Sequence, residues 1–283
     1  MTIEYTNVNY SEGFGYLAEV ERAKNRVSEE AGATRGALIT ALTQRLDRGH
    51  KQKLEACRSN LAEPCNWSIC PVCVERTQRS LIVEVAACVD HLFSEGELPI
   101  VAVAADFPGQ RYEHIIDINL GSLNRKIQRQ YTEAGFPLAV SGVQISVSRD
   151  DRTEADIWEA GVCSVIVGLR KREVLKRIST LYPGQSLRRW RPNLDAETAL
   201  WSTMRTGYFH QVTHKRSNGF KVTRPEGLPG KELRQLWHWF GQYKMTERFV
   251  LTGCRLTDGE IELNRGVEER LKKSDSRRSR RRN

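Results

Sequence analysis

The sequence predicts an α+β protein in which helices flank an antiparallel sheet, with a helical, cysteine-containing segment before it. Apolar, β-branched runs occur at 98–106, 138–148 and 158–169, and such runs are typical of buried strands. Segments with apolar residues at helical spacing lie between and after them. The resulting order of strand, helix, strand, strand, helix favours an α+β domain with an antiparallel pair at its centre.

The first part of the chain is predicted to be helical. Apolar residues recur at helical spacing over 14–30, 34–56 and 77–95. The cysteine-rich segment 57–76 separates the last two of these helices, and Pro71 is expected to interrupt regular structure there.

The remaining elements follow in order along the chain. A helix over 117–133 follows the first strand and ends at Gly135, and a helix over 171–181 follows the third strand. Beyond residue 185 we expect a strand pair around 248–263 that turns at Asp258-Gly259. We also expect three further helices, near 195–213, 230–243 and 265–273.

Four of the seven cysteines are spaced Cys57-x7-Cys65-x4-Cys70-x2-Cys73. Structural zinc sites bind four thiolates at tetrahedral corners, about 2.3 Å from the metal. The spacing therefore predicts one Zn²⁺, and a closed four-thiolate shell makes it structural because no position is open to substrate. A site in which His50 replaces one cysteine, or a set of buried or redox-active thiols, are the alternatives.

The other cysteines and the apolar pattern indicate the compartment. Cys88, Cys163 and Cys254 are expected to be small buried side chains. Clustered thiols are typical of the reducing cytosol. No apolar run of about 20 residues is present, and the first residues lack the pattern of a secretory signal. We therefore expect a cytoplasmic protein without a membrane partner.

Positive charge is concentrated near the end of the chain. The formal net charge is +9, and seven Lys or Arg with one Asp in 271–283 account for +6 of it. The last ten of these residues, 274–283, include Arg278, Arg280 and Arg281 and are predicted to be a disordered tail that acts as an electrostatic arm for nucleic acid. A solubilising end is the alternative.

A second basic stretch, 171–192, holds seven Lys or Arg and one Glu, with Tyr182 and Trp190 between them. Arginines bind phosphates and aromatic rings stack on bases, so the stretch is a candidate nucleic-acid surface. A solvated helix face is the alternative. The candidate DNA-binding residues are Lys171, Arg172, Arg188, Arg189 and Arg191, together with His210, His214 and Lys215, whose two histidines would share one helical face.

The segment CNWSICPVCVERTQR (65–79) resembles one found early in plasmid rolling-circle replication initiators, the Rep family with an HUH-type nuclease core. The elements that follow are similar to that family as far as about residue 255, including SGVQISVSRDD (141–151), WEAGVCSVIVG (158–168) and FGQYKMTERFVLTGCR (240–255). The resemblance implies a HUH/Rep-like core and a DNA partner, either single-stranded or an origin hairpin. It also implies host replication proteins as partners in plasmid or mobile-element replication.

One feature departs from this family. Its third strand carries two histidines around one apolar residue, and they bind Mg²⁺ or Mn²⁺, which polarises the scissile phosphate. Here Gly161 and Cys163 stand at those positions, around Val162, so we expect the nicking site to be lost. Tyr208 is the best-placed candidate for the family's tyrosine nucleophile, with Lys215 two helical turns on.

Three functions are therefore open. The first is a DNA-binding Rep-like protein that has lost nicking. The second is an active rolling-circle endonuclease that uses Tyr208 with Mg²⁺ or Mn²⁺. The third is a zinc-containing RNA- or protein-binding adaptor. The predicted domains are 1–96, helical with a zinc knuckle; 97–265, the Rep-like α+β core; and 266–283, a basic helix end and disordered tail.

Overall fold

The structure is a computed structural model. The residues that it describes are 35–36, 39–40, 48–57, 65, 67–90, 100–150, 156–183, 212–215, 221–224, 230–257 and 260–279. The predicted helix over 14–30 lies outside them, as does most of the one predicted near 195–213.

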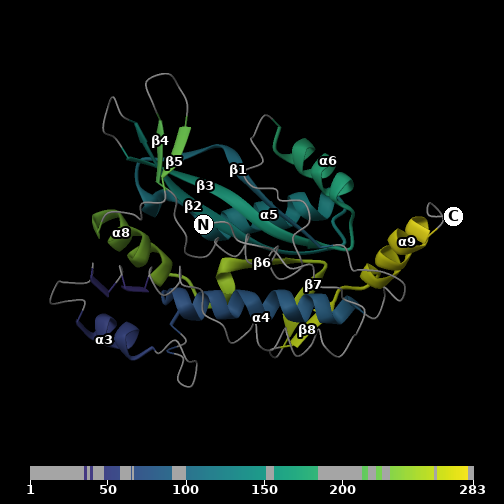
Figure 1. The fold of residues 1–283 in the computed structure, drawn as a ribbon, viewed down its shortest axis with the longest axis horizontal. Helices are drawn as coiled ribbons and strands as arrows, with labels where there is room; N and C mark the ends of the chain where they lie inside the picture. Colours follow the sequence, from purple (N-terminus) through teal and green to yellow (C-terminus); the bar gives the residue numbers. More distant parts are fainter. Residues whose placement is uncertain are drawn as a thin grey trace, which may run out of the picture.

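Figure 1 shows the helices and strands of the described residues. The helices are α3 (Arg48–Ala56), α4 (Pro71–Asp90), α5 (Leu120–Glu133), α6 (Lys171–Leu181), α8 (Gly230–Gly241) and α9 (Val267–Ser279), with short 3-10 turns η2 (Ile115–Asp117) and η4 (Met245–Arg248). The strands are β1 (Ile100–Tyr112), β2 (Leu138–Asp150), β3 (Asp156–Val167), β4 (Val212–Lys215), β5 (Lys221–Arg224), β6 (Phe249–Thr252), β7 (Cys254–Thr257) and β8 (Glu260–Leu263).

Strand β3 lies between β1 and β2 in a six-stranded sheet of order β1-β3-β2-β4-β5, and β6 also pairs with β2. Because β3 is antiparallel to both β1 and β2, those two strands run parallel to each other, and α5 connects them in a split β-α-β unit. The predicted antiparallel pair at the centre, β2 with β3, is confirmed.

The far edge of β2 is shared by two short strands. Residues 139–142 pair antiparallel with β6, and residues 147–150 pair parallel with β4. A parallel neighbour needs a long connection, and the chain between α6 and β4 is long enough to supply it. The α+β class is therefore confirmed, although the sheet is not wholly antiparallel.

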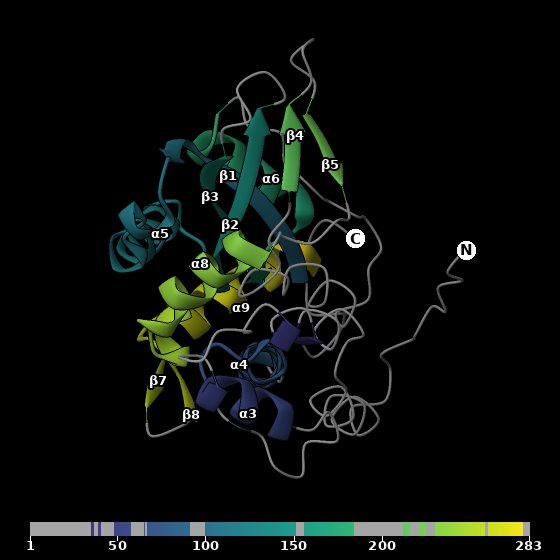
Figure 2. The ribbon, with the colours of Figure 1, turned by 90° about the vertical axis from the view of Figure 1, so that its left-hand side faces the viewer.

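Both faces of β3 are buried. Trp158, Val162 and Ile166 belong to the larger core, together with apolar residues of α5 and α6. The alternate residues Val165 and Val167 belong to a second core, with residues of α4 and α9. Figures 1 and 2 show α4 beneath the sheet, between the sheet and α3.

Four local predictions need correction. Pro71 does not interrupt a helix but begins α4, because proline at the first helical position loses no hydrogen bond. His214 and Lys215 lie in strand β4 and not on a helix, because they pair with β2 and β5. Helix α9 continues to Ser279, well into the segment predicted to be disordered. Strand β1 extends past 106 to Tyr112.

The turn predicted at Asp258-Gly259 lies outside the described residues, but the strands on either side pair as a hairpin requires. β7 and β8 are antiparallel, with Thr257 opposite Glu260. Gly253 joins β6 to β7 at a φ of 78°, a backbone conformation that glycine adopts without strain.

Gly161 lies where a backbone oxygen of β1 comes close to β3. It lies between Asp106 of β1 and Gln144 of β2. A Cβ at this position would be 2.8 Å from the backbone oxygen of Ala105, closer than carbon and oxygen tolerate. Only glycine fits at the middle of the sheet here without displacing β1.

We predict that Gly161→Ala lowers the free energy of unfolding by about 1–3 kcal/mol, because the added methyl overpacks the strands. Gly121→Ala is the matched control. Its Cβ would meet atoms no closer than 3.6 Å, and alanine is favoured in helices by up to about 1 kcal/mol. Urea unfolding of both variants measures the difference, and equal stabilities would show that β1 yields easily at this point.

Candidate functional site

The Sγ atoms of Cys57, Cys65, Cys70 and Cys73 lie within 4.8 Å of one another. Cys73 is 3.6 Å from Cys57 and 3.5 Å from Cys65, and Cys70 is 3.6 Å from Cys57. These separations are far longer than the 2.03–2.05 Å of a disulfide bond, so all four thiols are free. The cluster of four cysteines that the spacing predicted is therefore present. The side chain of His50, the alternative ligand, lies outside the described part of the chain.

Local structure brings these four thiols together from three short pieces of chain. Cys57 follows the last turn of α3, and its amide donates to the Lys53 carbonyl. The amide of Cys70 donates to the Trp67 carbonyl, closing a turn directly before α4. Cys70 thus precedes Pro71, the first residue of α4, and Cys73 lies in the first turn of that helix.

Two positive groups lie near the cluster, but its burial opposes negative charge. The N-terminus of α4 carries a partial positive charge, which stabilises thiolates close to it. The guanidinium of Arg35 donates a hydrogen bond to the Cys57 carbonyl, which adds a cation nearby. Three of the four cysteines are almost fully buried, so water contributes little to stabilising their charge.

Without a cation the thiols are hard to ionise. The contact with Cys70 lowers the pKa of the Cys65 thiol, but the contact with Cys73 and burial together raise it by more. The pKa of this thiol is therefore raised to about 12. Contacts with Cys65 and Cys73, followed by burial, raise the pKa of the Cys70 thiol far above its ordinary value. Four thiolates at this point therefore require a positive ion at the centre.

The geometry of the four cysteines fits one such ion. A tetrahedral metal with sulfur ligands at about 2.3 Å places its sulfurs about 3.8 Å apart. Three of the observed pairs are 3.5–3.6 Å apart, and the other pairs lie within 4.8 Å. Four soft sulfur ligands are the set that zinc prefers in structural sites. The cysteines can therefore hold one metal ion, with no position open to a substrate.

The cysteine loop also packs against the rest of the protein. The Trp67 ring meets Trp237 of α8 edge to face, with centroids 6.2 Å apart. On the same helix, the Trp239 indole donates to the Ile118 carbonyl over 2.9 Å. The cluster is thus linked through α8 to the segment that leads into α5. Trp237 and Trp239 are both buried.

The centre of the sheet differs from a metal site. The thiol of Cys163 donates to Gln144 Oε1 over 3.2 Å, and the buried carboxylate of Glu159 is 3.2 Å from Arg111 Nε. Gly161 between them has no side chain. Within the described ranges, the four cysteines are the only group of three or more His, Cys, Asp or Glu close enough to share a metal.

The three cysteines outside the cluster are buried to different degrees. Cys163 and Cys254 are buried, whereas Cys88 is half-buried and donates to the Ile261 carbonyl. Burial, and then the neighbouring Cys88, raise the pKa of the Cys254 thiol to about 12. This thiol therefore stays protonated at neutral pH and packs as a small apolar group.

The predicted DNA-binding residues are only partly described. Lys171 and Arg172 are exposed on the first turn of α6. Tyr182, at the end of the same helix, is buried and its hydroxyl donates to Gln130, so it cannot stack on a base as predicted. The backbone of Arg278 belongs to helix α9. The remainder lie outside the described residues: Tyr208, Arg188, Arg189, Arg191, Trp190, His210, Arg280 and Arg281.

Sequence reasoning missed a second group of cations. Arg125 and Arg129 of α5 lie beside Arg255 of β7 along an open groove. The two helical arginines are four residues apart, opposite the apolar face of α5, and this pattern could have identified them. Arg255 joins them only through the folded arrangement of β6 and β7.

Comparison of the chain with protein-family models, curated proteins and solved structures finds no match. None of the described helices is both long and apolar enough to cross a membrane.

We predict that Cys70→Ser abolishes stoichiometric metal binding, because it removes one of four ligands from a closed shell. The native chain should contain about one metal ion, and the segment around the cluster should lose protection from hydrogen exchange when the ion is lost. Elemental analysis after gel filtration measures the content.

The matched control for this substitution is Cys88→Ser, which replaces a half-buried thiol outside the cluster and keeps a donor for the Ile261 carbonyl. It should leave the metal content unchanged. A Cys70→Ser protein that retains the native amount of metal would contradict the assignment of the site.

Proposed function

We propose that this chain is a DNA-binding, replication-initiator-like protein of the Rep type that has lost its own nicking site. We also propose that the ion held by the four cysteines is Zn²⁺. Its proposed setting is the control or initiation of plasmid or mobile-element replication in the cytoplasm, with DNA and host replication proteins as partners.

The observation that carries this proposal is the position of β3. In the family that the sequence resembles, the third strand bears the metal-binding histidines, and here the third strand lies inside the sheet, between β1 and β2. The split β-α-β unit around it and the cysteine cluster before it occur in the order that the resemblance implies. Together these features support a Rep-like protein over an unrelated adaptor.

The packing around Gly161 supports the loss of nicking. A histidine there would place its Cβ 2.8 Å from a backbone oxygen of β1, so the position cannot recover a ligand without moving the strand. Cys163 is a poor ligand for Mg²⁺ or Mn²⁺, which prefer oxygen, and its thiol already bonds Gln144. The strand retains its structural role alone.

Zinc has a structural role in this proposal. The ion would hold the end of α3, the turn at Trp67 and the start of α4 together, and α8 would pack on the resulting surface through Trp237. The closed shell supplies no electrophile for phosphodiester chemistry.

We predict that the purified protein binds DNA but does not nick it. Cleavage by a tyrosine needs stabilisation of the charge that develops on the phosphate, and the paired ligands for a metal at that point are absent. Each ~1.4 kcal/mol added to the barrier slows the reaction tenfold, and losing such a metal costs several kcal/mol.

The assay uses supercoiled and single-stranded DNA with Mg²⁺ or Mn²⁺, and scores nicks, covalent protein–DNA adducts and retained DNA. The Tyr208→Phe variant is the control in the same assay. An adduct formed by the native chain and absent with Tyr208→Phe would overturn the proposal in favour of an active initiator. A native chain that retains no DNA would overturn the DNA-binding part of it.

A further inference from the structure

An open groove of about 640 Å³ runs between α5 and the strands β6 and β7, whose positions Figure 1 shows. Its lining residues are Asn124, Arg125, Gln128, Arg129, Phe249, Val250, Leu251, Cys254 and Arg255. The groove lies away from the cysteine cluster, and none of the candidate DNA-binding residues predicted from the sequence lines it.

The charges along this groove have one sign. Three of the lining residues are arginines and none is a carboxylate. Arg125 and Arg129 are both exposed and one helical turn apart, about 6 Å along the axis of α5. In the part of the chain that the structure describes, no carboxylate forms an ion pair with either of them.

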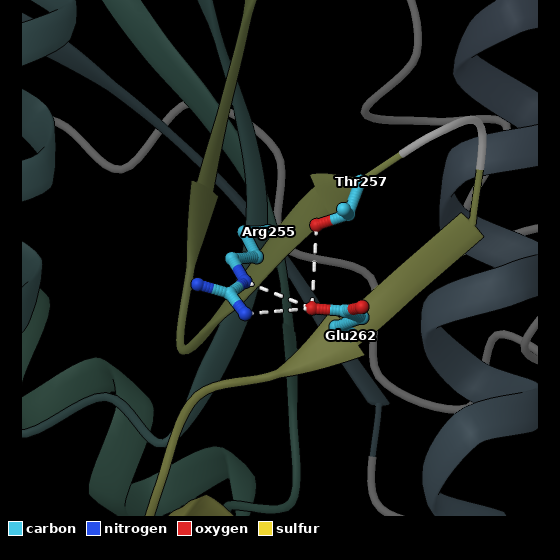
Figure 3. Close-up of polar contacts among 3 residues, drawn as sticks. All are labelled: Arg255, Thr257 and Glu262. Carbon is cyan, nitrogen blue, oxygen red and sulfur yellow. Dashed lines mark hydrogen bonds and ion pairs between the residues drawn. The ribbon is translucent and has the colours of Figure 1, made fainter.

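Arg255 is held in a fixed position at the other side of the groove. Its Nε and Nη2 donate to Glu262 Oε2 over 2.9 and 2.8 Å, and the Thr257 hydroxyl donates to the same oxygen. Figure 3 shows the three side chains meeting across the β7–β8 hairpin. Hydrogen bonds from Arg255 lower the pKa of Glu262, so this carboxylate stays ionised at neutral pH and offsets part of the charge of Arg255.

The floor of the groove is apolar and its backbone is already bonded. Phe249 and Leu251 of β6 supply apolar surface between the arginines. The Leu251 carbonyl accepts a hydrogen bond from Gln128 of α5 over 3.2 Å, and the opposite edge of β6 pairs with β2. A peptide adding to β6 as a further strand would have to break these bonds.

We propose that this groove binds a segment of single-stranded nucleic acid, with Arg125, Arg129 and Arg255 on the backbone phosphates and bases over the apolar floor. Guanidinium groups bind phosphates through paired hydrogen bonds, and apolar and aromatic side chains accept the faces of unpaired bases. The inference rests on the proposed function and assigns to it a surface that the sequence did not indicate.

The test measures binding of a labelled oligothymidylate and a labelled oligouridylate to the full chain by fluorescence anisotropy at several salt concentrations. Arg125→Gln with Arg129→Gln removes two phosphate contacts. We expect affinity at about 0.1 M salt to fall about tenfold, and the slope of log K against log salt to become shallower by about 1.4.

The matched control is Lys51→Gln with Lys231→Gln, which removes the same charge from α3 and α8 and should weaken binding less than about twofold. A groove variant that binds like this control, while the native chain binds both oligonucleotides, would overturn the groove assignment and leave the proposed function standing. A native chain that binds neither oligonucleotide would also overturn the groove assignment, and its retention of supercoiled DNA would then decide the proposed function separately. A duplex DNA and a polyglutamate peptide are measured in the same way. The choice of a single strand would be overturned if the groove variant lost affinity for the duplex alone, or if the native chain bound the peptide as tightly as the oligonucleotides.

A second variant should act in the opposite direction. Glu262→Gln removes the carboxylate that competes for Arg255, and we expect affinity for both oligonucleotides to rise about threefold. An exposed ion pair contributes little to stability, so the variant should fold normally, as circular dichroism would show. Unchanged or weaker binding by a folded Glu262→Gln protein would show that Arg255 does not contact the phosphates.

Discussion

Four thiols, three of them buried, lie within 4.8 Å of one another. They are the constraint on which the N-terminal layer, α3 and the start of α4, depends. Their separations suit a tetrahedral ion, and the raised pKa values of Cys65 and Cys70 show how poorly the site holds negative charge without one. The same three pieces of chain end α3, form the turn at Trp67 and begin α4. Trp67 contacts α8, and α8 donates a hydrogen bond to the segment before α5. The cluster is therefore connected, through α8, to the segment that leads into α5.

The sheet has a constraint of its own at β3. The strand is paired on both edges and buried on both faces, by α5 and α6 on one side and α4 and α9 on the other. Close approach of β1 leaves room only for glycine at 161. The packing that holds β3 against β1 also prevents position 161 from carrying a metal-binding side chain. On the surface, by contrast, the arginines of α5 and β7 line an open groove.

Local patterns predicted the parts of this structure that depend on neighbouring residues. Helix α6 has the predicted bounds, β2 and β3 fall where the apolar alternation put them, and the cysteine spacing identified the cluster. Pairings between distant segments were beyond such reasoning. The parallel pairing of β4 with β2 depends on tertiary contacts that leave no local signal in the sequence. The same is true of the groove that Arg125 and Arg255 line together. Pro71 was misjudged because proline both ends and begins helices, and His214 because a four-residue spacing also occurs by chance in strands.

The central claim is that four sulfur atoms surround one zinc ion and hold the N-terminal layer to the sheet. X-ray absorption at the zinc edge of the purified native chain tests it most directly, because it reports the ligand atoms and their distances without a variant that could misfold. We expect a single shell of four sulfurs at about 2.3 Å. A shell containing nitrogen or oxygen ligands, or a folded chain that contains no zinc, would contradict the account.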